Sequence, residues 1–202
     1  ISMSRMFGSC RSLRKLEISG FRTSSVTGMS GLFAGCEALE ELDLSGLDTS
    51  NVINMISMFS SCESLRELDL SSFMTHRVTD MSWMFCGCRN LKKLDISSFD
   101  TSGVTDMSCM FFTCRSLEEL DLSGFDVSRA VNMDNMFMYC SSLRCLDLSG
   151  FDTTGAENMK DMFTGCDSLS SVHTGPLFDF HIESENGCFL PEAKITSGGG
   201  AP

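Results

Sequence analysis

Several features that mark common classes of protein are missing from this sequence. No apolar run approaches the roughly 20 residues of a membrane-spanning helix, so membrane insertion is not expected. No secretory signal peptide is visible at the start of the chain. Basic residues are few, with 15 Lys and Arg against 27 Asp and Glu. The resulting net charge of −12 makes nucleic acid and anionic membranes poor partners.

Proline is also scarce, and its position indicates how the chain is organised. Only three prolines occur, and they lie close to the C-terminus at Pro176, Pro191 and Pro202. We predict a single repetitive domain over residues 1–177, a hairpin-like terminal cap over residues 178–196, and a flexible tail over residues 197–202. An Asn-Gly pair at residues 186–187 is expected to form the turn of that hairpin.

What the chain has in abundance is Met, Phe and Cys, with 15, 16 and 11 copies. Most of them recur at an interval of 26 residues, together with a motif of the form Leu-Asp-Leu-Ser. The aligned columns include one of Met (Met3, Met29, Met55, Met81, Met107, Met133 and Met159), one of Phe (Phe7, Phe33, Phe59, Phe85, Phe111, Phe137 and Phe163) and one of Cys (Cys10, Cys36, Cys62, Cys88, Cys114, Cys140 and Cys166). A fixed period of this length is typical of a solenoid, in which each unit buries its apolar side against its neighbours.

Each repeating unit predicts a strand, a turn and a short helix. Residues 16–18 and their copies alternate apolar and polar side chains, as in a half-buried strand. Val26, Met29, Phe33 and Cys36 are spaced three, four and three residues apart, as on one face of a short helix. We therefore predict an α/β fold: a solenoid of seven 26-residue coils, with parallel strands on one face and short helices on the other. Because helices need ~8–10 Å each and strands ~4.8 Å, the strand face should be concave unless the helical segments are thin.

The repeat resembles a known family. The pattern Leu13-x-x-Leu16-x-Ile18 and its copies resembles a leucine-rich repeat. A longer motif begins with Leu-Asp-Leu-Ser and continues with the Val, Met, Met-Phe, Cys and Leu positions that follow it. Over residues 1–177 this motif resembles the 26-residue repeat of BspA-like bacterial surface proteins. This resemblance implies a secreted or cell-wall-associated bacterial protein that binds partners or mediates adhesion, without catalysis. The Asn or Cys that other leucine-rich repeats place in the turn is replaced here by Phe73 and its counterparts, so that turn geometry does not carry over.

The cysteine column raises the question of metal binding or disulfides. One Cys per 26 residues, without paired Cys-x-x-Cys motifs, is not the spacing of a zinc site. Side chains in register lie about one coil apart, which is farther than the Cβ separation of ~3.8 Å that a disulfide prefers. We therefore expect free thiols buried in the core, with Cys145 exposed on the strand face and the Met columns filling the core. No metal and no cofactor are expected.

A column of acidic residues is the candidate binding site. It occupies the outward position between the two apolar residues of each strand, at Glu17, Asp43, Asp69, Asp95, Asp121 and Asp147. Like charges opposite each other across strands are destabilising, so something must offset their repulsion. Neighbouring Ser hydroxyls and backbone donors could solvate them, in which case the column is structural. Alternatively, the column binds a basic partner or Ca²⁺.

Three functions compete at this point. The first is a binding or adhesion module at the bacterial cell surface, in the cell wall or in the extracellular medium, with a protein or glycan macromolecule as partner. The second, an enzyme, would need a cluster of carboxylates or His that breaks the period, whereas the deviations at Met74, His76, Cys145 and His173 are scattered; we expect no enzyme. The third is an intracellular scaffold, which the many free Cys favour. We also expect that further coils precede Ile1 in a longer chain.

Overall fold

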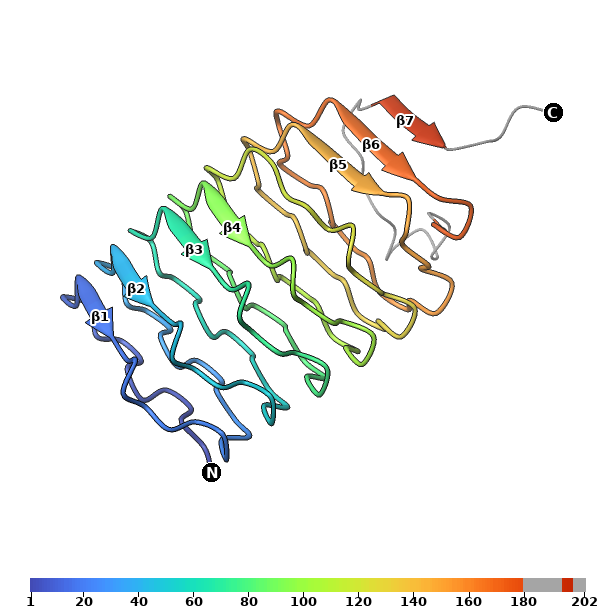
Figure 1. Ribbon diagram of the computed structural model, residues 1–202. Helices are drawn as coiled ribbons and strands as arrows, with labels where there is room; N and C mark the ends of the chain where they lie inside the picture. Colours follow the sequence, from blue (N-terminus) through green and yellow to red (C-terminus); the bar gives the residue numbers. More distant parts are fainter. Residues whose placement is uncertain (180–193, 198–202) are drawn as a thin grey trace.

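The computed structural model describes residues 1–179 and 194–197. Its coils lie side by side along one axis, and each strand lies along the same edge of the array (Figure 1). The strands are β1 (Lys15–Glu17), β2 (Glu41–Asp43), β3 (Glu67–Asp69), β4 (Lys93–Asp95), β5 (Cys145–Leu148), β6 (Ser171–Thr174) and β7 (Lys194–Ser197). The expected turn of the cap and the end of the expected tail, at residues 198–202, lie outside the described residues.

Strand pairing is parallel throughout, and the pairs formed by β1 to β6 keep the 26-residue register. Strand β1 pairs with β2, β3 with β4, and β5 with β6, so that Leu68 lies opposite Leu94 and Leu146 opposite Val172. Strand β7 extends the last sheet, and Lys194 lies opposite Ser171. A second series of parallel bridges joins corresponding residues in successive coils (Ser2, Gly28, Asn54, Asp80, Asp106, Asn132 and Asn158). Equivalent side chains therefore meet across coils, which confirms a solenoid of stacked repeats.

The predicted short helices do not form: no helix occurs in residues 1–179 or 194–197. Residues 29–36 and their copies are instead a chain of tight turns, which we call the turn segments. Within one turn segment, Leu32 N–H donates to Met29 O at 3.1 Å, three residues back. Gly31 and Phe33 instead donate their N–H groups to Ile56 and Met58 of the next coil, at 2.8 and 2.9 Å. An α-helix requires every N–H to bond four residues back within its own segment, so this alternation excludes one.

Backbone geometry explains why a helix cannot form here. Two positions in each turn segment have positive φ, for example Gly31 at 61° and Gly35 at 74°. A left-handed residue at every fourth position interrupts any right-handed helix. Because the turn segments hydrogen-bond directly to one another, they stack as closely as the strands do. The physical reason for a concave strand face, a thicker layer of helices, is therefore absent.

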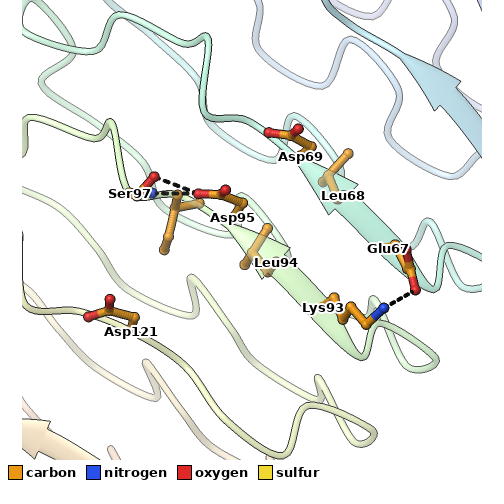
Figure 2. A pocket seen from close by; sticks show the side chains of 9 residues that line it. Glu67, Leu68, Asp69, Lys93, Leu94, Asp95, Ser97 and Asp121 are labelled. Atoms are coloured by element: carbon orange, nitrogen blue, oxygen red, sulfur yellow. Dashed lines mark hydrogen bonds and ion pairs between the residues drawn. The ribbon is translucent and has the colours of Figure 1, made fainter.

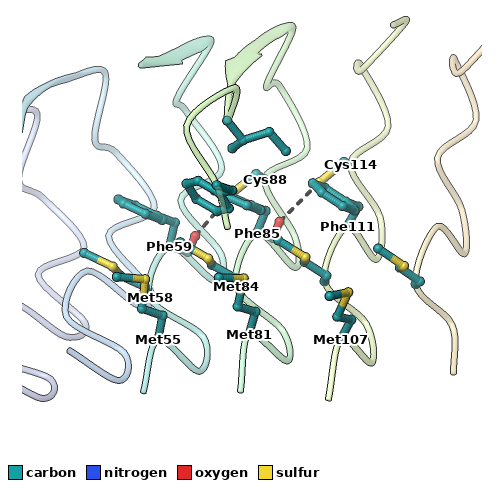
Figure 3. Close-up of a cluster of buried hydrophobic side chains, with 14 of the residues drawn as sticks. Met55, Met58, Phe59, Met81, Met84, Phe85, Cys88, Met107, Phe111 and Cys114 are labelled. Atoms are coloured by element: carbon teal, nitrogen blue, oxygen red, sulfur yellow. Dashed lines mark hydrogen bonds between the residues drawn. The ribbon is translucent and has the colours of Figure 1, made fainter. Parts of the chain in front are cut away.

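The core consists of the predicted columns. Phe85 stacks between Phe59 and Phe111, with ring centroids 5.7 and 5.5 Å apart. The side chains of Met81 and Met84, which precede Phe85 in the sequence, are fully buried. Figure 3 shows the same arrangement repeating from one coil to the next. The spacing of apolar residues therefore predicted correctly which side chains are buried, although it predicted the wrong backbone conformation for the segment that carries them.

The cysteines in the described residues are free, as predicted, and the column is buried from Cys36 to Cys166. Cys10 differs from the prediction, because its side chain in the first coil is exposed. The buried thiols also have a role that the sequence did not reveal. Cys88 Sγ donates to Phe59 O at 3.2 Å, and Cys114 Sγ to Phe85 O at 3.2 Å (Figure 3). Each thiol thus links one coil to the carbonyl of the preceding coil.

A column of buried threonines makes a second set of links between coils. Thr75 Oγ1 donates to Asp100 O at 2.9 Å and accepts Asp100 N–H at 2.8 Å. Thr49 bonds Met74 in the same way, at 3.1 and 2.8 Å. One hydroxyl therefore bonds both backbone polar groups of one residue in the next coil.

Candidate functional site

The outward side chains of the strands and of the equivalent residues in each coil form the strand face. Glu17 lies opposite Asp43 in the register of β1 and β2, and Asp69 lies opposite Asp95 in that of β3 and β4. All six predicted residues are exposed, and Figure 2 shows Asp69, Asp95 and Asp121 on successive coils. The structure therefore brings them together in one row, the acid column, which His173 follows opposite Asp147.

Hydrogen bonds from nearby serines hold most of these carboxylates. Ser71 N–H donates to Asp69 Oδ1 at 2.9 Å, and both the N–H and the hydroxyl of Ser97 donate to Asp95 Oδ1, at 3.0 and 2.7 Å (Figure 2). Equivalent backbone bonds run from the serines two residues after the other aspartates (Ser45 to Asp43, Ser123 to Asp121 and Ser149 to Asp147). The first of the two alternatives, solvation by serine and backbone donors, thus has a direct structural basis.

The same bonds keep four members of the acid column charged. Hydrogen bonds from Ser71 lower the pKa of Asp69, and those from Ser45 lower the pKa of Asp43. The pKa values of Asp121 and Asp147 are lowered for the same reason, by Ser123 and Ser149. A lowered pKa means that these carboxylates stay ionised from neutral pH down to below their ordinary value of 3.8.

The columns of residues 11, 14 and 15 and their copies mix acidic and basic residues, whereas the acid column carries one sign only. Their ion pairs join residues 26 apart, for example Arg14 with Glu40 at 2.9 Å and Lys93 with Glu67 at 2.7 Å. Further pairs of this kind follow the same interval (Arg11 with Glu37, Lys15 with Glu41, Arg89 with Glu63 and Arg144 with Glu118). Within the acid column, Glu17 contacts Lys15 at 3.4 Å. In the described part of the chain, no ion pair involves the column's members from Asp43 to Asp121.

Two shallow hollows lie over the strand face. One, of about 500 Å³, is lined by β3, β4 and the next coil, including Asp69, Asp95 and Asp121 (Figure 2). The other, of about 540 Å³, lies over β1 and β2 and includes Glu17 and Asp43. Partly buried strand leucines form the floor of each hollow, as Leu94 does in the first. A partner would therefore meet carboxylates and an apolar strip together.

Two further properties bear on what this surface can do. Among the described residues, no group of three or more His, Cys, Asp or Glu side chains is placed to hold a metal ion. The Ca²⁺ alternative for the acid column therefore gains no support. Nor does the described part of the structure contain a helix of the length and apolarity needed to cross a membrane.

Comparison with known proteins shows similarity to a protein family and to a solved structure. A family described as "Mycoplasma protein of unknown function, DUF285" matches this chain over residues 1–94 and 62–175. Among solved structures, the chain is similar to a leucine-rich repeat protein from Bacteroides ovatus ATCC 8483, with 16% sequence identity and a TM-score of 0.34. That similarity covers 87% of this chain and 59% of the other, so this chain spans about 59% of that protein's length. No curated protein matches the sequence.

Proposed function

This repeat protein of the leucine-rich-repeat type belongs to the DUF285 family of Mycoplasma proteins of unknown function, and we propose that it is a non-catalytic binding module. Its site is the acid column, Glu17, Asp43, Asp69, Asp95, Asp121 and Asp147. The partner is a macromolecule, a protein or glycan that presents positive charges at intervals along an extended surface. A solenoid offers such an elongated site because each coil repeats the same outward group.

The charge pattern carries this proposal. In the columns of residues 11, 14 and 15 and their copies, acidic and basic residues 26 apart neutralise each other, as Glu67 and Lys93 do. A loop column with Asp100, Asp126 and Asp152 also repeats one sign, so the acid column is distinguished by its place on the strand face. The acid column repeats one sign from coil to coil at a cost in repulsion. Serine hydrogen bonds lower that cost while leaving the other carboxylate oxygens exposed. A basic partner would remove the remaining repulsion on binding, and its affinity should weaken as salt screens the charges.

The protonation states of its acids and thiols support a role without catalysis. A carboxyl that donates a proton near neutral pH needs a raised pKa, whereas hydrogen bonds lower the pKa of Asp69 and Asp121. A nucleophilic cysteine needs a lowered pKa, whereas burial raises the pKa of Cys88 to about 12.

For location, we propose a bacterial cell surface, cell wall or secreted form, as in the BspA-like proteins that the repeat resembles. An intracellular scaffold for protein interactions is the second candidate, and the free cysteines favour it. Exposed Cys10 and Cys145 are the thiols to follow. Labelling intact cells and cell lysates with a membrane-impermeant maleimide separates the candidates, because a surface protein reacts on intact cells and an intracellular one only after lysis.

The acid column is tested by removing three of its charges. The variant Asp69→Asn, Asp95→Asn, Asp121→Asn should bind an immobilised oligolysine peptide at least about tenfold more weakly than the wild type at low salt. The difference should shrink as salt is raised, since the lost term is electrostatic. Surface plasmon resonance at two salt concentrations measures both effects. Protein and glycan arrays, probed with the same two proteins, extend the test to natural partners.

A matched control exists in the same repeat. Asp48, Asp100 and Asp152 accept similar bonds from the residue two positions on (Ser50, Ser102 and Thr154), but they lie in the loops after the strands. Replacing these three by Asn changes the net charge equally and should leave oligolysine binding within about twofold of the wild type. Equal losses in both triple variants would show that net charge alone, and not the acid column, binds the peptide.

A further inference from the structure

The outward side of the turn segments forms a second surface, which we call the turn face. Its N-terminal part is a hollow of about 380 Å³ over the first three coils. The residues that line it are nearly all small, including Gly31, Ala34, Gly35, Ser57 and Ser60. This surface shares no residue with the acid column, because the strands and the turn segments form different sides of each coil.

The C-terminal part of the turn face carries large side chains at the same repeat positions. Trp83, Phe112 and Tyr139 come from three successive coils, and Phe112 contacts both of the others, with ring centroids 6.2 and 5.9 Å apart. Trp83 and Tyr139 are 44% and 42% exposed, and they are the chain's single Trp and single Tyr. Both adopt a φ of 62°, a conformation that is unfavourable for bulky residues. These rings are large apolar groups that remain in solvent although the fold has a core for such groups.

We propose that the turn face is the interface of an antiparallel dimer of this chain, with the two-fold axis at Trp83. This axis lies in the plane of the contact and perpendicular to the direction in which the coils stack. It therefore places each residue opposite the same repeat position of the partner. The coil that lies one or two places before the coil of Trp83 then faces the coil of the partner that lies the same number of places after it. Tyr139 therefore meets Gly35 of the second copy, Met138 meets Ala34, and Phe112 meets Ser60.

Sterically, this pairing matches a large residue with a small one at each of these positions. The Tyr139 ring lies over Gly165 of the next coil in its own chain and is 42% exposed, so it forms a raised part, or ridge, of this face. The hollow at Gly31, Gly35 and Ser61 is the matching depression at the other end of the same face. Each copy presents this ridge and this hollow at opposite ends of the described turn face, so one two-fold contact buries both pairs, as an isologous interface requires.

Charges at the ends of the turn face are complementary in the same pairing. Arg5 in the first coil and Asp161 in the last occupy one column, and the two-fold axis brings them together twice. In a neighbouring column, Arg11 meets Asp167, and Glu63 meets Arg115. Arg89 meets its own copy, and its contact with Glu63 of the same chain, at 3.6 Å, offsets that repulsion. A parallel arrangement would give neither the charge match nor the ridge-in-hollow match, so the second copy must be antiparallel.

The dimer leaves the strand face open, so this inference stands apart from the proposed binding of a basic partner. The full 202-residue chain should sediment as a concentration-dependent mixture of monomer and dimer. Trp83 is the only Trp, so its fluorescence emission should shift to shorter wavelength as the dimer forms. Trp83→Gly and Tyr139→Gly should each weaken dimerisation at least about tenfold. Both variants should fold, because glycine suits positive φ and Gly31 and Gly35 already occupy these columns.

Mixing charge variants tests the antiparallel arrangement directly. Arg5→Asp and Asp161→Arg should each weaken self-association, whereas an equimolar mixture of the two should restore it, because both end contacts then pair opposite charges. Met74→Ala, which removes an exposed side chain outside the turn face, should change nothing. A chain that is monomeric at all concentrations would overturn the proposal, as would open-ended filaments or a mixture no stronger than its components.

Discussion

Raising the pH from about 8 to about 11 should unfold this protein cooperatively, because thiols buried in the core cannot ionise there. Burial raises the pKa of Cys88 and Cys166 to about 12, from an ordinary value of 9.0. Burial also raises the pKa of Cys62, Cys114 and Cys140 well above that value. In the unfolded chain these thiols lose their protons above pH 9, whereas in the folded chain they keep them.

The sign of the effect follows from that difference in bound protons. Below pH 9 both states are protonated, so the stabilising contribution of the neutral thiols is fully present. Between about 9 and about 12 the folded state binds more protons, so its stability falls by about 1.4 kcal/mol per pH unit for each thiol. Five such thiols together give a slope of roughly 7 kcal/mol per pH unit, comparable with the whole stability of a typical domain.

Urea unfolding at a series of pH values, with a reductant present, measures this slope. The variant Cys88→Ser, Cys114→Ser, Cys140→Ser retains a donor for each Phe carbonyl but no longer titrates there. Its slope above pH 9 should be smaller by about 4 kcal/mol per pH unit, and below about pH 8 it should differ from the wild type by a constant offset. Equal slopes would show that these thiols are accessible to solvent in the folded state.

Replacing Phe85 by Ala should lower the free energy of unfolding by about 3–5 kcal/mol. Its ring is fully buried and stacked between Phe59 and Phe111, so its removal leaves a cavity in the middle of the array. Each coil contacts only its neighbours, so this cavity also separates the N-terminal coils from the C-terminal ones. Urea unfolding should therefore show both a lower midpoint and a broader transition.

Phe85→Leu is the matched control, because it keeps most of the volume and should cost less than about 1.5 kcal/mol. A loss of under about 1 kcal/mol for Phe85→Ala would mean that the ring does not lie in a close-packed interior. A loss equal to that of the Leu variant would mean that stacking of the rings, and not the filled volume, is what matters.

The repeat made much of this structure predictable, and particular residues show where prediction failed. Leu42, Phe33 and Cys36 repeat so regularly that the interior and the stacking direction follow from the sequence. The helix prediction for residues 29–36 was wrong, because a spacing of three and four residues also fits successive tight turns. Gly31 and Gly35 signalled the left-handed positions, but Ser57 and Trp83 adopt the same conformation without being glycine.

The candidate site was predictable in position but not in detail. The alternation of apolar and polar residues placed Asp69 and Asp95 on the outside, and the structure has both exposed there. The hydrogen bonds from Ser71 and Ser97 to these two carboxylates were predicted only as one of two alternatives. The threonine links through Thr49 and Thr75 were missed, although Thr recurs there at the same interval, because Thr in a turn has many other roles.

A crystal structure of this chain would show whether successive 26-residue units stack in register through both strands and turn segments. We expect that Phe85 N–H donates to Met110 O at about 2.9 Å, and that the sulfurs of Cys62, Cys88 and Cys114 lie 3.3, 3.2 and 3.2 Å from a Phe carbonyl of the preceding coil. We also expect positive φ at Trp83 and Gly87. An α-helix over residues 81–88, or sulfurs that point into solvent, would show that the units do not stack in this way.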